Sequence, residues 1–215
     1  MNEIEIAGER LHLLPQRAAY WARERTLFIA DIHFGKAAAF RAQGVPVPRG
    51  TTAENLAVLD ALLDTTQAER IVFLGDFLHA KTSHAPATLG ALRAWRSRCA
   101  QLDLVLVRGN HDARAGEPPK DLGVRVVDEP FRFGPFALCH HPQTLDGAYV
   151  LAGHIHPAYR LHGRGEAVRL PCFWFNHALG VLPAFGSFTG THTIAPAPGD
   201  RIFLVTPDRV LPLRA

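Results

Sequence analysis

The sequence predicts an α/β fold that contains either one mixed β-sheet or two packed sheets. Apolar runs alternate with helical patterns in the first half of the 215 residues, whereas short extended runs follow one another from about residue 123. A hydrophobic fraction of 47% allows a sizeable core to be buried. No linker long enough to separate domains interrupts these patterns, so we expect a single domain over residues 1–215.

The first elements are a hairpin and a buried strand. Residues 4–14 (IEIAGERLHLL) alternate between apolar and polar around an Ala-Gly turn, which predicts an opening hairpin. Residues 26–30 (TLFIA) form a short apolar run that suits a buried strand. The prolines and glycines of residues 44–50 (GVPVPRG) predict a loop after it.

Two helices and two further strands complete the first half. Residues 51–64 begin with a capping box from Thr51 to Glu54 and place Leu56, Leu59 and Leu63 on one stripe, which predicts an amphipathic helix. Buried strands are predicted at 70–76 (RIVFLGD) and 102–109 (LDLVLVRG). Between them, Ser83 is the expected cap of a helix that turns Leu89, Leu92 and Trp95 inward and Arg93 and Arg96 outward.

The second half is a succession of strands. The extended runs cover residues 123–127, 131–140, 148–154, 166–175, 200–205 and 209–213. One of them contains the aromatic stretch CFWFNH (172–177), which we interpret as a core strand, with base stacking as the less favoured alternative.

Composition limits the environment and the partners. The longest apolar runs are too short to cross a bilayer, and the N-terminus has no secretion-signal pattern, so we expect a cytoplasmic protein without membrane contact. The three cysteines, Cys99, Cys139 and Cys172, are widely spaced and are expected to be reduced thiols. A net charge of +3 permits an anionic partner without requiring one.

Potential metal ligands follow five of the predicted strands. Singly, such residues are more often turn or surface residues, but the repetition favours a common site, because strands of open α/β sheets present their sites at their carboxyl ends. The residues are Asp31 and His33; Asp76 and His79; Asn110, His111 and Asp112; His140 and His141; and His154 and His156.

The ligand types indicate the metal chemistry. Carboxylates, imidazoles and an amide oxygen without thiolate suit Mn²⁺, Fe²⁺ or Zn²⁺. There are more ligands than one ion can use, and two ions that share a bridging carboxylate account for the number. Such ion pairs lie about 3.5–4 Å apart and act on phosphoryl groups.

The series D-x-H, G-D, G-N-H-D, H and G-H-x-H over residues 31–156 resembles the calcineurin-like metallophosphoesterase superfamily. The resemblance implies a sandwich of two mixed β-sheets flanked by helices and metal-assisted hydrolysis of a phosphoester. It also implies the ligand sets: Asp31, His33, Asp76 and His156 for one metal, and Asp76, Asn110, His140 and His154 for the other.

The same resemblance suggests roles for the remaining motif residues. His111 would contact the substrate phosphate and donate a proton to the leaving oxygen, and Asp112 would orient His111. In the sequence CHHP, the family pattern favours His140 as the ligand, with His141 as the alternative.

The substrate is suggested by a closer resemblance. The chain is similar nearly end to end to the DNA-ligase-associated metallophosphoesterases. The matching stretches are LHLLPQRAAYW, TLFIADIHFGKAAAFRAQGVPVPRGTT, LGDFLHA, RGNHD, LAGHIHP and LPAFGSFTG. That family implies a manganese-dependent DNA endonuclease or phosphodiesterase of the bacterial DNA-damage response, with a DNA ligase, a helicase and an exonuclease as partners. Gly-Asp-x-x-His at His79 also resembles repair nucleases in which this histidine places the scissile phosphate, although a solvated loop histidine is the alternative.

Basic residues near the predicted site are candidates for phosphate contacts. Lys36 and Arg108 are the candidates for substrate binding, with further charges at Arg41, Arg49, Lys81 and Arg114. Scattered arginines more often only solvate a surface, and we find no nucleic-acid-binding module that would read a DNA sequence.

A small-molecule phosphomonoesterase or nucleotide phosphodiesterase is the alternative function. A non-catalytic scaffold is disfavoured because all ligands are present, and no oligomeric state is predicted.

Overall fold

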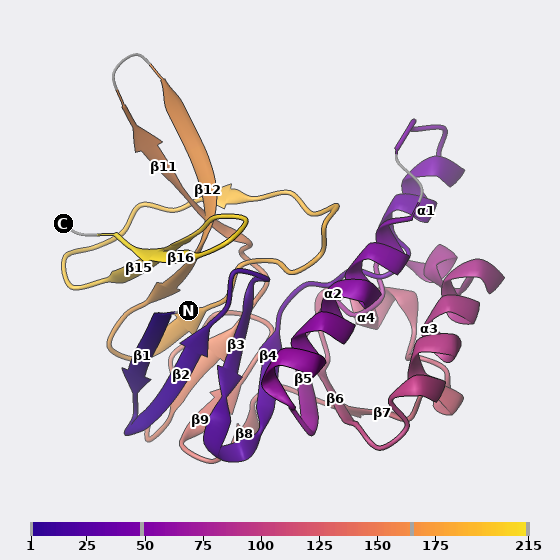
Figure 1. Cartoon of the computed structure of the whole chain (residues 1–215), viewed down its shortest axis with the longest axis horizontal. Coiled ribbons are helices and arrows are strands. Elements are labelled where there is room, and N and C mark those ends of the chain that lie inside the picture. Colours follow the sequence, from indigo (N-terminus) through magenta and orange to yellow (C-terminus); the bar gives the residue numbers. More distant parts are fainter. Residues whose placement is uncertain (1, 48–49, 164–165, 214–215) are drawn as a thin grey trace.

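Two mixed β-sheets lie face to face in the computed structural model, which describes residues 2–47, 50–163 and 166–213 (Figure 1). The first sheet has seven strands, arranged in the order in which they occur along the chain. Strands β1 to β4 pair antiparallel and include the predicted opening hairpin, and β4 to β7 pair parallel. Their bounds are β1 (Asn2–Ile6), β2 (Glu9–Leu13), β3 (Ala18–Trp21), β4 (Thr26–Ile29), β5 (Arg70–Leu74), β6 (Asp103–Val107) and β7 (Val124–Val127).

The second sheet has nine strands and is built from the second half of the chain. Its path is β14-β11-β12-β13-β10-β9-β8, with β15 beside β12 and β16 beside β15. Parallel and antiparallel pairs both occur, so this sheet is also mixed. The strands are β8 (Phe131–Phe133), β9 (Phe136–Leu138), β10 (Tyr149–Ala152), β11 (Pro157–His162), β12 (Ala167–Phe175), β13 (Leu179–Val181), β14 (His192–Thr193), β15 (Arg201–Val205) and β16 (Val210–Pro212).

Helices cover the face of the first sheet that points away from the second sheet, and they lie on the right of Figure 1. No helix within the described ranges has both the length and the apolar character that a membrane crossing requires. The fold class predicted from the sequence is confirmed. The helices are α1 (Lys36–Ala42), α2 (Thr51–Thr66), α3 (Pro86–Arg98) and α4 (Asn110–Ala115), with short 3-10 turns η1 (Ala22–Glu24), η2 (Lys81–His84) and η3 (Lys120–Leu122).

Both predicted helix caps are wrong, although the helices exist. Helix α2 starts at Thr51 itself, and its N-cap is Gly50, whose φ of +96° lies in the left-handed region. Helix α3 starts at Pro86, whereas Ser83 lies inside the η2 turn, where its hydroxyl accepts a hydrogen bond from the main-chain N–H of Ala80 (3.2 Å). Glycine and proline therefore set these starts through their backbone geometry.

Two details of the predicted helix faces also differ. Leu62 rather than Leu63 completes the fully buried stripe of α2. On α3, Arg96 is half-buried rather than outward, and its guanidinium donates hydrogen bonds to the main-chain carbonyls of Cys99 and Leu102 (2.7 and 2.8 Å). These two carbonyls follow the helix, so the arginine stabilises its C-terminal end.

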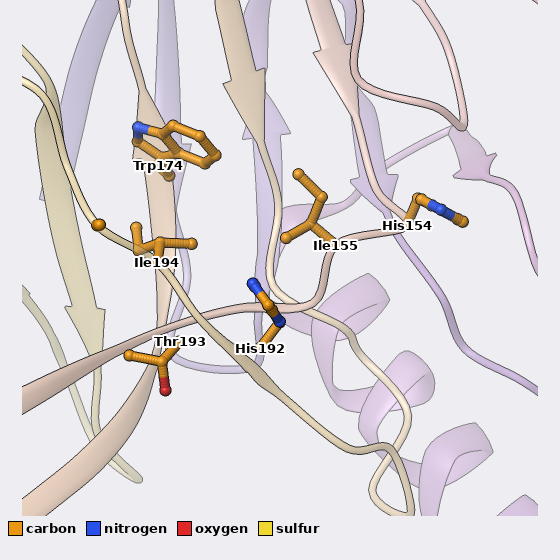
Figure 2. A pocket seen from close by; sticks show the side chains of 7 residues that line it. His154, Ile155, Trp174, His192, Thr193 and Ile194 are labelled. Carbon is orange, nitrogen blue, oxygen red and sulfur yellow. The ribbon is translucent and has the colours of Figure 1, made fainter.

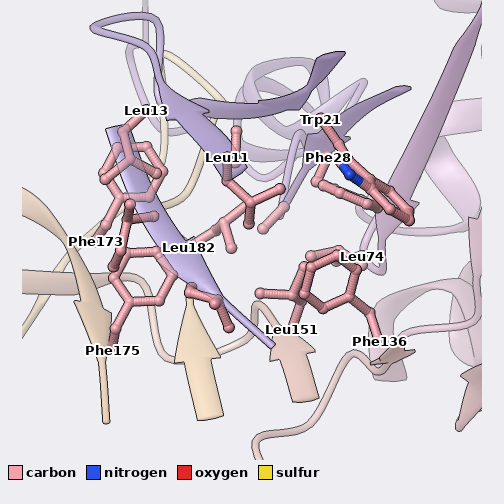
Figure 3. Close-up of a cluster of buried hydrophobic side chains, with 14 of the residues drawn as sticks. Leu11, Leu13, Trp21, Phe28, Leu74, Phe136, Leu151, Phe173, Phe175 and Leu182 are labelled. Atoms are coloured by element: carbon pink, nitrogen blue, oxygen red, sulfur yellow. The ribbon is translucent and has the colours of Figure 1, made fainter. Parts of the chain in front are cut away.

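The inter-sheet core is the cluster of buried side chains between the two sheets (Figure 3). Trp21 and Phe28 of the first sheet meet Phe136 of the second, with ring centroids 5.1 Å apart for Trp21 and Phe136 and 6.2 Å apart for Phe28 and Phe136. The indole N–H of Trp21 donates to the buried Glu9 carboxylate (2.8 Å), so its polar atom is satisfied. This core fixes the position of one sheet relative to the other.

The helix-side core is the corresponding cluster between the first sheet and the helices. It contains Leu59 of α2, Leu92 of α3 and Phe73 of β5. Strands β4 to β6 are therefore covered on both faces, which explains why their sequences are nearly unbroken apolar runs.

Strand β12 contains the aromatic stretch of the sequence and divides it between two faces. Phe173 and Phe175 are buried in the inter-sheet core, as the core-strand interpretation predicts. Trp174 points to the opposite face because successive side chains of a strand alternate. It is half-buried, among residues of a separate apolar cluster.

Candidate metal centre

The predicted ligands converge at the carboxyl ends of strands from both sheets. Asp31, Asp76 and Asn110 follow β4, β5 and β6 of the first sheet. His140 and His154 follow β9 and β10 of the second sheet. Several of these residues fall into overlapping groups of three whose potential ligand atoms lie within 4.8 Å of one another. The structure therefore brings together side chains that are more than a hundred positions apart in the sequence.

The first predicted ligand set is compact. His156 Nε2 lies 3.4 Å from Asp31 Oδ1, and His33 Nε2 lies 3.7 Å from Asp76 Oδ2. Asp31, His33 and His156 form one of the groups of three. Two carboxylates and two imidazoles thus point at one region, as a divalent cation requires.

The second predicted set shares Asp76 with the first. His140 Nε2 lies 3.5 Å from Asp76 Oδ1 and 2.9 Å from Asn110 Oδ1. His154 Nδ1 lies 3.0 Å from the same His140 nitrogen. The two sets therefore meet at Asp76, the position that a bridging carboxylate would occupy.

The structure distinguishes the two adjacent histidines of CHHP. His140 is fully buried, and its Nδ1 donates to the Leu74 carbonyl (3.0 Å), which leaves Nε2 directed at Asp76 and Asn110. The His141 ring is half-exposed, and its Nδ1 donates a hydrogen bond to Glu129 Oε1 (2.6 Å). The geometry thus favours His140 as the ligand, although His141 also lies beside His154, with ring centroids 4.6 Å apart.

Main-chain groups hold the other ligands in place. Asp31 Oδ2 accepts a hydrogen bond from the His154 N–H, and Asp76 Oδ1 accepts one from the His111 N–H, both at 2.9 Å. The Nδ1 of His156 donates to the Gly190 carbonyl (3.1 Å). Each side chain is oriented through one atom, which leaves another for a metal.

Backbone strain is concentrated at these same residues. Nine non-glycine residues within the described ranges have a positive φ, and five of them are predicted ligands. A positive φ costs a residue with a side chain about 1–3 kcal/mol, and such strain clusters at functional sites. The five ligands are Asp31 (+54°), His33 (+48°), Asp76 (+53°), His154 (+70°) and His156 (+54°).

The glycines of the motifs leave room for the ligands. A Cβ atom on Gly75, which has a φ of +84°, would lie 2.0 Å from His140 Nδ1. A Cβ atom on Gly153 would lie 2.6 Å from Asp31 Oδ2. The glycines of G-D and G-H-x-H are therefore required because a ligand side chain packs directly against their backbone.

Unpartnered buried atoms test whether this site fits a metal. Asp31 Oδ1, His33 Nε2 and His156 Nε2 are buried without a hydrogen-bond partner, and all three belong to the first predicted ligand set. Leaving such atoms unpaired costs free energy, which a cation would recover. The residues present therefore fit a divalent metal.

The pKa shifts of the site residues also fit a divalent metal. Burial, reinforced by the neighbouring Asp31, raises the pKa of the Asp76 carboxyl. Burial lowers the pKa of the His33, His140 and His154 imidazoles, so these rings are held neutral with a lone pair free to coordinate. A divalent cation would offset the repulsion between the two buried carboxylates.

His111 lies at the edge of the ligand groups. Its Nδ1 donates to the His79 carbonyl (2.7 Å), and its Nε2 lies 4.0 Å from Asp76 Oδ2. The His79 ring stacks on it at 4.6 Å between centroids, and His79 Nδ1 lies 3.4 Å from His33 Nδ1. Both histidines are thus at the site, and the solvated-loop alternative for His79 is not supported.

The predicted contact between Asp112 and His111 is wrong. Asp112 is buried, and its two carboxylate oxygens accept hydrogen bonds from the main-chain N–H groups of Leu78 and Gly109 (3.0 and 2.9 Å). Burial raises the pKa of this carboxyl to about 6. Asp112 therefore ties the loop after β5 to the loop after β6, and the His79 carbonyl orients the His111 ring instead.

The basic side chains that were candidates for substrate binding differ in their surroundings. Lys36 is half-buried at the start of α1, where burial lowers its pKa and the charges of Asp31 and Asp76 oppose that shift. Arg108 does not fit a substrate-binding role, because its guanidinium already pairs with Asp128 and Glu117, both at 3.0 Å. Lys81 and Arg114 are exposed, Arg41 is half-buried, and Arg49 lies outside the described residues.

Two supporting residues were missed in the sequence. The Glu129 carboxylate accepts hydrogen bonds from the main-chain N–H groups of His140 and His141 (2.7 and 2.9 Å), and no local pattern marks it. Asn55 interrupts the apolar stripe of α2, which was an available signal. It donates to the Ile32 carbonyl (3.3 Å) between two ligands and accepts from the Ser187 N–H (3.1 Å).

A protein-family comparison identifies this arrangement. The family model described as calcineurin-like phosphoesterase matches residues 24–156, which include every predicted ligand. The chain belongs to this family. The resemblance noted in the sequence is confirmed, and the protein is a metal-dependent phosphoester hydrolase.

Solved structures include two similar proteins. A nuclease MPE from Pseudomonas putida is 47% identical to this phosphoesterase over 99% of each chain, with a TM-score of 0.88. A phosphoesterase from E. coli, Yfce, is 14% identical over 84% of this chain and 87% of that chain, with a TM-score of 0.39, a likeness too small to carry an argument. No curated protein sequence matches the chain significantly.

Proposed function

We propose that this phosphoesterase is a two-metal DNA phosphodiesterase that acts as an endonuclease. The observation that most supports this proposal is that two overlapping ligand sets meet at Asp76. His111 Nε2 lies 4.0 Å from the carboxylate that they share. The specific choice of a nuclease is supported by the similar Pseudomonas putida protein, which is a nuclease and is 47% identical.

We assign the ligands of the two metal sites as the family resemblance implies. Asp31, His33, Asp76 and His156 would hold one ion, and Asp76, Asn110, His140 and His154 the other. Mn²⁺ is the proposed metal, with Fe²⁺ and Zn²⁺ as alternatives, because the donors are oxygens and imidazoles without thiolate. Bound divalent ions supply positive charge to the phosphoryl oxygens and lower the pKa of water, which is how such centres promote hydrolysis.

His111 is assigned as the proton donor to the leaving oxygen. Its Nδ1–H is held by the His79 carbonyl, so in the imidazolium form the Nε2–H faces the edge of the ligand groups where a phosphate would lie. Burial lowers the pKa of the stacked His79 to about 4, so His79 stays neutral at pH 7 and does not compete for the proton. His79 thereby positions His111 and lies where it can contact the phosphate.

The remaining parts of the proposal concern DNA and cellular context. Lys36 would contact the phosphate, with Arg41, Lys81 and Arg114 as further backbone contacts. The resemblance to DNA-ligase-associated enzymes supports a role in the DNA-damage response, in the cytoplasm, together with a DNA ligase, a helicase and an exonuclease. We propose no sequence-specific readout.

Substrate preference tests the proposed function. With Mn²⁺, the purified protein should hydrolyse bis-p-nitrophenyl phosphate faster than p-nitrophenyl phosphate and should cut plasmid or single-stranded DNA. Parallel reactions with Mg²⁺, Zn²⁺ and Ca²⁺ identify the preferred metal. The Asp76→Ala variant, purified in the same way, controls for contaminating nucleases. A preference for the monoester, or hydrolysis of nucleotides without cutting of DNA, would favour the alternative small-molecule enzyme.

A further inference from the structure

A cavity of about 610 Å³ opens beside the metal centre (Figure 2). Its wall includes the predicted ligand His154, the apolar side chains of Ile155 and Trp174, and the segment from His192 to Ala195. In Figure 2, Ile155 lies between Trp174 and His154. The cavity therefore begins where the ligand cluster ends.

Trp174 presents a fixed aromatic surface to this cavity. Its indole N–H donates to Asp200 Oδ2 (2.7 Å), and the same oxygen accepts a hydrogen bond from the Ala197 N–H (2.9 Å). The ring is thus oriented through its polar edge. The other two tryptophans, Trp21 and Trp95, are only 1% and 3% exposed, so Trp174 is the indole that a ligand can reach.

The segment that lines the cavity also orients a predicted metal ligand. Strand β14 pairs with the start of β11, and the His192 N–H donates to the His156 carbonyl (2.9 Å). Two residues earlier, the Gly190 carbonyl accepts the hydrogen bond from His156 Nδ1. The wall of the cavity is therefore joined to the metal centre by two hydrogen bonds to His156.

We propose that this cavity holds one unpaired nucleobase of the substrate strand, stacked against Trp174, while a neighbouring phosphate lies at the metal centre. This inference rests on the proposed nuclease function. A base has an apolar face that suits Trp174, Ile155 and Ile194, and polar edges that His192 and Thr193 can meet at the exposed rim. Stacking tolerates every base, which fits an enzyme without sequence-specific readout.

Trp174 is thus a binding residue for DNA that a phosphodiester strand without bases does not use. Base stacking on an aromatic side chain contributes about 1–3 kcal/mol, so Trp174→Ala should raise the KM for a thymidine oligonucleotide about 5- to 150-fold. Trp174→Phe should restore most of the loss, because it keeps an aromatic face. Val168→Ala, on the same strand but 52% exposed on the projecting β11–β12 hairpin, is the matched control and should behave like the wild type.

The experiment compares these three variants with Mn²⁺ on the oligonucleotide and on an abasic oligonucleotide of the same length, which has the phosphodiesters but no aromatic ring to stack on Trp174. A rise in KM confined to the oligonucleotide and reversed by Trp174→Phe supports the proposal. An unchanged KM for the oligonucleotide overturns it, as does an equal loss on both substrates, which would mean that Trp174 only supports the fold.

A fluorescence titration separates this inference from the proposed function. Thymidine should quench the tryptophan emission of the Mn²⁺-loaded wild type, whereas deoxyribose at the same concentration should not, and Trp174→Phe should lose the response. No selective quenching overturns the base site even if the enzyme cuts DNA. A wild type that hydrolyses bis-p-nitrophenyl phosphate but cuts no DNA contradicts the nuclease function instead.

Discussion

The first sheet buries both of its faces, one in the inter-sheet core and the other in the helix-side core. The two cores are similar in character: Phe136 and Leu92, one from each, are 0% and 1% exposed. Their consequences differ because the ligands come from both sheets. The inter-sheet core sets the distance between Asp76 and His140. The helix-side core packs against the outer face of the first sheet and supports the ligand loops through Ile32 and Phe77, but it does not set the spacing between the two sheets. Two cores of equal burial can therefore differ in how directly they fix the metal centre.

The largest effect should follow from removing the residue at which the two ligand sets meet. Asp76→Ala should lower hydrolysis by roughly 10³-fold or more, because both ions would lose a ligand. Metal analysis of the purified protein should find both sites depleted, and the exposed Asp64→Ala on α2 is the control for loss of a carboxylate. If one ion stays fully bound to Asp76→Ala, this carboxylate does not bridge.

A second variant tests His111, which contacts His33 and His79 and belongs to neither core. His111→Ala should retain its metals and lose about 10²- to 10⁴-fold in the rate of DNA cleavage, the usual contribution of a general acid. The loss should be smaller with bis-p-nitrophenyl phosphate, because p-nitrophenolate leaves without a proton. His177→Ala, an exposed loop histidine, is the control. Loss of metal from His111→Ala would mean that His111 is a ligand.

A matched pair of core variants tests the comparison itself. Phe136→Ala and Leu92→Ala should both lower the free energy of unfolding, by about 3–5 and 2–5 kcal/mol. Only Phe136→Ala should also weaken Mn²⁺ binding, by roughly tenfold, because the two sheets lose their fixed spacing. Urea unfolding and calorimetric titration of Mn²⁺ measure the two quantities. Equal weakening of Mn²⁺ binding in both variants would show that the two cores do not differ in this way.

The smallest effect concerns the stability of the wild type. Mn²⁺ at about a hundred times its dissociation constant should stabilise the fold by about 2.7 kcal/mol for each ion bound, and a chelator should reverse this. For a chain of this size the melting temperature should rise by roughly 5–10 °C for each ion. Asp31→Asn should reduce the rise, since one buried oxygen ligand becomes an amide. An undiminished rise in this variant would argue that Mn²⁺ binds elsewhere.

The sequence predicts the parts of this molecule that depend on local patterns. The strands β4, β5 and β6 are apolar runs, and the polar residues that follow them mark the site because parallel strands end at one edge. The helix caps predicted at Thr51 and Ser83 were wrong, since backbone geometry at Gly50 and Pro86 overrides the polar side chains.

Long-range contacts account for most of what the sequence did not predict. The orientation of His111 by a carbonyl of the β5 loop, the ion pairs of Arg108 and the support from Glu129 all join segments that no local pattern connects. Trp174 shows how far the sequence of one strand can be interpreted. Alternation along β12 predicts that Trp174 and Phe173 point to opposite faces, but the cavity beside Trp174 depends on the position of β14, which no local pattern gives.

The most direct test of the account is a crystal structure of the protein grown with Mn²⁺ and measured at the manganese absorption edge. The account predicts two anomalous peaks about 3.5–4 Å apart. Asp76 should lie between them, ligands from the first sheet should contact both ions, and histidines of the second sheet should complete each set. A single peak, or two peaks bound by residues of one sheet only, would contradict the claim that docking of the two sheets creates the metal centre.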